Sequence, residues 1–141
     1  MSSIEKLLEF RFPAKAESLG LLRKNLREIL KAHSKSDETI NCVVLAVSEA
    51  CINIMEHAYR HDDNGDIIVE IEKQSDSITF RLTDFSLRKT CIEEMKSRPL
   101  DEIRPGGLGC HIINEIMDEI KLLDNGNTSG NILQLKKNIN N

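Results

Sequence analysis

Residues 46–60 read AVSEACINIMEHAYR and place a carboxylate and a carboxamide inside an otherwise apolar segment. At about 100° per residue, the twelve positions 43–54 cover every direction around a helix, yet only Ser48, Glu49 and Asn53 among them are polar. A helix without a solvated face is typical of a protein core. Glu49 and Asn53 lie one turn apart, so their side chains project together. The segment therefore predicts a core helix that carries one polar spot.

This polar spot needs a partner, because an unpaired carboxylate in a dry core is costly. In a purely structural interpretation, the spot is a buried hydrogen-bonded pair or lies at the rim of the core, and Glu49 reaches a lysine elsewhere in the fold. In a functional interpretation, Asn53 offers an oxygen to Mg²⁺, an ion that takes few protein ligands and keeps phosphate oxygens and water for the rest. Glu49 then lies near the phosphates as a base or as the group that orients water. His57, one turn further along, is either a packing or capping residue or part of the same site.

The whole chain limits the possible functions. With 141 residues, 40% hydrophobic and 30% charged, it is expected to form one globular domain, residues 1–141. The net charge of −4, with scattered lysines and arginines, gives no electrostatic footprint for nucleic acid or an anionic membrane. Charged residues interrupt any signal peptide near the amino terminus, so a reducing cytoplasm is expected. The cysteines lack metal-ligand spacing and are expected to be free thiols: Cys42, Cys51, Cys91 and Cys110.

Hydrophobic periodicity and turn residues divide the rest of the chain into helices and strands. Helical spacing predicts a helix over residues 17–33, and the core helix is expected to extend from about 37 to 59. Between residues 85 and 105 no periodicity is visible, and this connection is expected to be a functional lid. A third helix is expected to begin near Leu108. Alternating apolar residues predict strands at 4–12, 66–74, 77–84, 119–125 and 130–138.

Asp84 continues the face of its strand that carries Ile78, Phe80 and Leu82. Because side chains alternate along a strand, this carboxylate is directed to the core side of the sheet and is expected to face a pocket. An ionised carboxylate only accepts hydrogen bonds, and the exocyclic amine of adenine is a neutral donor that suits it. The alternative is an aspartate that simply ends the strand.

Glycines precede the third helix in the stretch RPGGLGCHIINEIM, residues 104–117. Gly106, Gly107 and Gly109 allow backbone N–H groups to turn toward an anion, and the amino terminus of the helix adds a partial positive charge. These features suit phosphates. No G-K-[ST] follows and no strand directly precedes, which excludes P-loop and Rossmann interpretations. A glycine hinge before a helix remains the alternative.

The order of these features resembles the GHKL, or Bergerat, ATP-binding fold: E-x-x-x-N-x-x-x-H-A on a helix, a strand pair that ends in Asp, a lid, and G-G-L-G before a helix. Within that superfamily the chain is similar to the anti-sigma-factor serine/threonine kinases. The similarity covers about residues 8–137. The stretches that carry it are Glu49-Ala50, Asn53, His57-Ala58-Tyr59, GGLGCHIINEIMDEI and SGNILQLKKN.

This resemblance implies an α+β fold, a two-layer α/β sandwich in which a mixed, mostly antiparallel sheet is covered on one face by helices. It implies ATP and Mg²⁺ as cofactors, with Glu49 as catalytic base and Asn53 on the metal. The residues that it assigns to the nucleotide are Asn53, His57, Asp84, Gly106, Gly107, Leu108 and Gly109.

The resemblance also implies a function and partners. Such a kinase phosphorylates a small anti-sigma-factor antagonist and, as a homodimer, holds a sigma factor inactive, with no direct nucleic acid or membrane partner. One departure bears on this expectation: the family usually has glycine shortly after the adenine-binding aspartate, whereas DFSLRKT, residues 84–90, has none. The alternative is a non-catalytic nucleotide-binding or degenerate module that sequesters a regulatory protein.

Overall fold

The computed structural model describes residues 3–34, 36–58, 65–86, 107–123 and 130–139. Apart from Phe85 and Ser86, the predicted lid lies outside these residues, as does Gly106.

Each predicted strand and helix is present. The elements in chain order are β1 (Glu5–Pro13), α1 (Ser18–His33), α2 (Asp37–Asn53), a π-helical turn η1 (Ile54–Ala58), β2 (Asp66–Gln74), β3 (Ser77–Asp84), α4 (Gly107–Ile116), β4 (Glu119–Leu123) and β5 (Asn131–Asn138).

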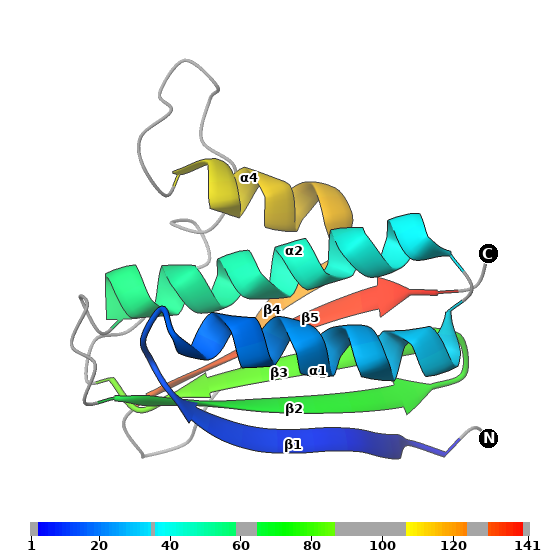
Figure 1. The fold of residues 1–141 in the computed structure, drawn as a ribbon, viewed down its shortest axis with the longest axis horizontal. Helices are drawn as coiled ribbons and strands as arrows, with labels where there is room; N and C mark the ends of the chain where they lie inside the picture. Colours follow the sequence, from blue (N-terminus) through cyan, green and yellow to red (C-terminus); the bar gives the residue numbers. More distant parts are fainter. Residues whose placement is uncertain (1–2, 35, 59–64, 87–106, 124–129, 140–141) are drawn as a thin grey trace.

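The strands form one sheet in the order β1-β2-β3-β5-β4. The pairings between the described strands are all antiparallel, so the mixed sheet expected from the sequence contains only antiparallel pairs here. In the β3–β5 register, Asp84 lies directly opposite Asn131. Helices α1, α2 and α4 lie on one side of this sheet (Figure 1). The predicted two-layer α+β architecture is therefore confirmed.

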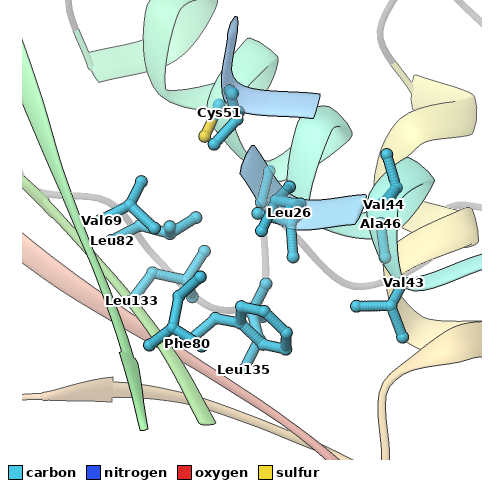
Figure 2. Close-up of a cluster of buried hydrophobic side chains, with 14 of the residues drawn as sticks. Leu26, Val43, Val44, Ala46, Cys51, Val69, Phe80, Leu82, Leu133 and Leu135 are labelled. Carbon is cyan, nitrogen blue, oxygen red and sulfur yellow. The ribbon is translucent and has the colours of Figure 1, made fainter. Parts of the chain in front are cut away.

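The core fills the space between the sheet and the helices (Figure 2). Alternation along the strands sends one apolar face toward the helices, and each large side chain fully buried there contributes roughly 1.5–3 kcal/mol to stability. Gly20 and the charged residues of α1 lie on its exposed side. The side chains that meet in this cluster include Leu26 of α1, Val43 and Cys51 of α2, and Val69, Phe80, Leu82, Leu133 and Leu135 of the sheet.

Helix α2 is the central helix of this layer. It begins after Ser36, whose Oγ accepts a hydrogen bond of 3.1 Å from the backbone N–H of Thr39. Among the described residues, the helical stretch Asp37–Glu56 is long and apolar enough to cross a membrane by length and composition alone. However, 61% of its apolar window is buried inside the fold, as in the core helix of a soluble protein. The predicted core helix is confirmed.

The end of this helix differs from the prediction. The α-helix stops at Asn53 and continues as the π-helical turn η1, whereas the sequence predicted an α-helix to about Tyr59. At the junction the N–H of Ile54 is shared between the carbonyl oxygens of Ala50 and Cys51, four and three residues back along the chain. A π-helical turn is wider than an α-turn, and such turns are frequent at functional sites. Hydrophobic spacing alone does not distinguish the two.

Candidate nucleotide site

Three chain segments with predicted site residues, and the start of β5, meet at one end of the molecule. The carboxyl end of α2, the carboxyl end of β3, and the first residues of α4 and β5 all lie toward the left of Figure 1. Helix α4 also packs against α2. The antiparallel arrangement causes this convergence, because β3 ends where β5 begins. Segments that are far apart in sequence thus contribute to one site.

Glu49 and Asn53 lie on the last turns of α2. Asn53 is only 4% exposed, and Glu49 is half-buried. Within the described part of the chain, Glu49 makes no hydrogen bond or ion pair, so no described lysine neutralises it. The structural interpretation, in which Glu49 reaches a lysine, is therefore not supported by these residues. A half-buried carboxylate without a described protein partner suits a group that acts on a ligand.

Ser48, the third polar residue of α2, has a structural explanation. Its side chain is fully buried, and its Oγ donates a hydrogen bond of 2.7 Å to the carbonyl oxygen of Val44, one turn back. The same Oγ accepts a hydrogen bond of 3.2 Å from Nε of Arg23 on α1. Ser48 therefore satisfies its polar atoms within the two helices, whereas Glu49 does not.

Asp84 ends β3 and is 1% exposed. Its Oδ1 accepts hydrogen bonds of 3.0 Å from the backbone N–H of Ser86 and of 3.0 Å from Nδ2 of Asn131. Nδ2 of Asn131 also lies 3.3 Å from Oδ2 of Asp84. Donors of this kind stabilise the charged form of a buried carboxylate and hold its orientation. The predicted orientation toward the core side is confirmed by its burial.

Gly130 allows β5 to approach β3 at this point. Its φ of +106° lies in the region that favours glycine, and a Cβ at this position would lie 2.3 Å from the carbonyl oxygen of Asp84. No side chain fits at that distance. The glycine thus permits the close backbone contact that precedes the pairing of Asn131 with Asp84.

The glycine stretch forms the start of α4. The helix begins at Gly107, so Gly107, Leu108 and Gly109 occupy its first turn, one residue earlier than predicted. The first N–H groups of any helix have no partner within the helix and carry partial positive charge, which suits phosphate. The backbone of His57 lies in η1. These placements agree with the predicted positions of the residues and leave their roles as predictions.

The residues fit a nucleotide better than a protein-coordinated metal. Among the described residues there is no group of three or more His, Cys, Asp or Glu side chains that could hold a metal ion. A metal ion at this site would therefore take most of its coordinating oxygens from a bound nucleotide and from water. Burial raises the pKa of the Cys51 thiol to about 12, so Cys51 is not a nucleophile at neutral pH. Cys42 is half-buried, and both are free thiols as predicted.

The sequence interpretation missed three contributors to this site. Asn131 and the backbone N–H of Ser86 hold Asp84, and Gly130 makes room for the contact. Ser86 stands near the position where the related family usually has glycine. The available signal was the pair Gly130-Asn131 at the start of a strand, but its partner becomes visible only with the register of β3 and β5.

Together these features define a class of protein: helices on one face of an antiparallel sheet, a buried aspartate at a strand end, and a glycine-led helix at the same end of the molecule. The sequence matches the family described as the histidine kinase-like ATPase domain over residues 12–137, and the chain belongs to this family. The resemblance seen in the sequence is confirmed.

Particular relatives are serine-protein kinases. The chain is 31% identical over 139 residues to the serine-protein kinase RsbW of Bacillus cereus, which covers 91% of this chain and 84% of that protein. It is 30% identical over 129 residues to the RsbW of Bacillus licheniformis, covering 86% of this chain and 81% of that protein. A solved structure of the RsbU and RsbW domains of a Mycobacterium tuberculosis protein superposes with a TM-score of 0.63 at 18% identity. That match covers 94% of this chain and 31% of the longer chain, and it concerns the fold.

Proposed function

We propose that the protein is an ATP-dependent serine/threonine kinase that phosphorylates another protein and acts as an anti-sigma factor. The observation that carries this proposal is the half-buried carboxylate of Glu49, which has no described protein partner and lies one turn from the buried Asn53. The names of the relatives support the reaction type.

The proposed site residues have different roles in binding Mg-ATP. Asp84 accepts a hydrogen bond from the exocyclic amine of adenine, and the N–H groups at Gly107 and Gly109 contact the phosphates. Gly106, Leu108 and His57 complete the proposed nucleotide site. Asn53 offers its amide oxygen to Mg²⁺. Bound Mg-ATP supplies the phosphoryl group and the charge that neutralises the phosphate oxygens.

Glu49 acts as the general base. Its carboxylate would take the proton of the serine or threonine hydroxyl as that oxygen attacks the γ-phosphorus of ATP in line, while the bond from this phosphorus to the bridging oxygen breaks and ADP leaves. Most of the rate in such transfers comes from positioning and charge stabilisation, and a positioned base adds roughly 10²–10⁴. A carboxylate tied to a lysine would be a poorer base, which is why the absence of a described lysine partner matters.

The proposal extends to partners. The acceptor is a small anti-sigma-factor antagonist protein, and the second partner is a sigma factor held by a homodimer in the cytoplasm. The proposal assigns this work to a single domain over residues 1–141. Direct contact with nucleic acid or a membrane is not part of the proposal.

The experiment compares Glu49→Gln, Asn53→Ala and the exposed control Glu28→Gln. Each protein is incubated with labelled Mg-ATP and the antagonist recovered by pull-down from the native cell, and ATP binding is measured by calorimetry. Glu49→Gln is expected to bind ATP and to lose transfer by ~10²–10⁴. Asn53→Ala is expected to lose Mg-ATP affinity and transfer together, and Glu28→Gln neither.

The outcomes separate the kinase from the non-catalytic alternative. Transfer by Glu49→Gln at the wild-type rate would remove Glu49 as base. ATP binding by wild-type protein without transfer to any co-purifying partner would favour a sequestering module. If millimolar Mg-ATP produces no heat and no change in melting temperature, where a ligand at a hundred times its dissociation constant adds about 2.7 kcal/mol, the nucleotide site itself is wrong.

A further inference from the structure

Two arginines of α1 lie against α2 without a carboxylate partner. Nη1 of Arg27 donates a hydrogen bond of 2.8 Å to Oδ1 of Asn41, and Nε of Arg23 donates one of 3.2 Å to Oγ of Ser48. Both acceptors are neutral, and within the described part of the chain neither arginine forms an ion pair. A guanidinium group is always protonated in a protein. The positive charges of these two exposed side chains are therefore available to a ligand.

An exposed leucine lies between these two contacts on α2. Leu45 follows Asn41 by four residues and precedes Ser48 by three, so the three residues share one side of the helix. The side chain of Leu45 is 43% exposed. Among the described elements, α1 and α4 each pack against α2 but make little or no contact with each other, so α2 keeps an outward side between them (Figure 1). An exposed apolar side chain with arginines beside it has the composition of a protein interface.

The position of this surface relative to Glu49 indicates which partner it takes. Leu45 lies one turn before Glu49 on the same helix, a rise of about 6 Å. A protein segment seated over Leu45 therefore has its neighbouring residues within reach of the proposed base. Of the two proposed protein partners, the acceptor is the one that must bring a hydroxyl to Glu49. The charges of Arg23 and Arg27 favour carboxylates on that segment.

We propose that Arg23, Arg27 and Leu45 form the docking surface for the protein acceptor, and that the acceptor segment seated there carries two acidic side chains with an apolar one between them. This inference rests on the proposed kinase function and adds the chemistry of the acceptor. The contacts on Asn41 and Ser48 are separated by about 10 Å along α2. That spacing matches residues i and i+7 of a helix, or i and i+3 of an extended segment. The charge of Arg23 makes the contact, and it persists without the hydrogen bond to Ser48.

The test is steady-state phosphate transfer to the purified antagonist protein that the wild type recovers from the native cell and phosphorylates. Arg23→Gln and Arg27→Gln each remove one positive charge and are expected to raise the KM for the antagonist about tenfold, the worth of one hydrogen bond to a charged group. Leu45→Ala removes the apolar contact and is expected to raise the same KM several-fold. In all three variants kcat and the dissociation constant of Mg-ATP are expected to stay at the wild-type values, because the surface binds only the acceptor.

The matched control is Lys24→Gln. Lys24 is exposed on the same helix, about 100° round from Arg23, and its substitution makes the same change in net charge. This variant is expected to keep the wild-type KM for the antagonist. Raising the salt concentration from about 50 to about 300 mM is expected to increase the KM of the wild type, because salt screens exposed charges, and to affect the double variant Arg23→Gln/Arg27→Gln much less.

The outcomes distinguish this inference from the proposed function. If the arginine variants change the KM for the antagonist no more than Lys24→Gln does, the inference is wrong while the kinase function stands. It is also wrong if they weaken only the retention of a sigma factor, or if kcat and Mg-ATP affinity fall together with the affinity for the antagonist. If wild-type protein binds Mg-ATP but transfers phosphate to no co-purifying protein, the proposed function fails and this inference with it.

Discussion

Nε of Arg23 on α1 donates a hydrogen bond of 3.2 Å to Oγ of Ser48 on α2. This contact separates the three polar residues of the apolar helix into two groups, because Ser48 joins two helices while Glu49 and Asn53 lie at the candidate site. Ser48 thus has a structural role, and the residue that follows it, Glu49, is the proposed base.

Ser48→Ala is expected to leave phosphate transfer unchanged and to alter the free energy of unfolding by no more than about 1 kcal/mol. The substitution removes one buried hydroxyl and improves helix propensity, and the exposed Arg23 can be solvated instead. Urea denaturation and the labelled-ATP assay measure the two quantities. A loss of transfer as large as that of Glu49→Gln would contradict the assignment of Ser48 to structure.

Local patterns were sufficient to predict most of the fold. The alternation of apolar residues placed Asp84 on the core side of β3, and apolar spacing identified α2 as a core helix. Both patterns are local, because they show which side chains of one strand or helix are buried. The π-helical turn after Asn53 was not predictable, since its apolar spacing also suits an α-helix. Such a turn is defined by the backbone carbonyl oxygens that accept hydrogen bonds from its N–H groups in the folded chain.

The candidate site was predictable only in its local parts. Glu49, Asn53 and the glycines before α4 stood out within short stretches of sequence. Asn131 did not, because its partner Asp84 lies 47 residues away and they meet only through the pairing of β3 with β5. The same holds for Gly130, whose need for a glycine arises from the backbone of another strand.

Gly130→Ala is expected to destabilise the protein by about 1–3 kcal/mol, because the alanine must adopt a φ of +106° and its Cβ would lie 2.3 Å from the carbonyl oxygen of Asp84. Displacement of Asp84 should weaken ATP binding as well. The matched control is Gly20→Ala on α1, where a Cβ meets no atom within 4 Å. That change is expected to stabilise the helix by roughly 0.5–1 kcal/mol. Equal urea midpoints for Gly130→Ala and wild type would show that the close approach is not required.

The pH dependence of stability tests the ion pair between Glu72 on β2 and Arg81 on β3. Nη1 and Nη2 of Arg81 on β3 donate hydrogen bonds of 2.8 and 2.7 Å to the two carboxylate oxygens of Glu72 on β2. The hydrogen bonds with Arg81 lower the pKa of Glu72 below 4.5, its ordinary value. A carboxyl group whose pKa is lowered by folding contributes its stability above the unfolded pKa and loses it as the pH falls through the folded pKa.

Glu72→Gln is therefore expected to be less stable than wild type by about 0.5–1 kcal/mol near neutral pH, the range for a partly exposed pair. The difference should shrink as the pH falls through the lowered pKa of Glu72, because wild-type Glu72 then becomes protonated while the glutamine variant has no carboxyl group to titrate. Urea denaturation at about pH 6 and about pH 3 measures both free energies of unfolding, with Glu28→Gln as the exposed control on α1. A stability difference between wild type and Glu72→Gln that is equally large at both pH values would mean that the Glu72–Arg81 pair does not contribute through its charge.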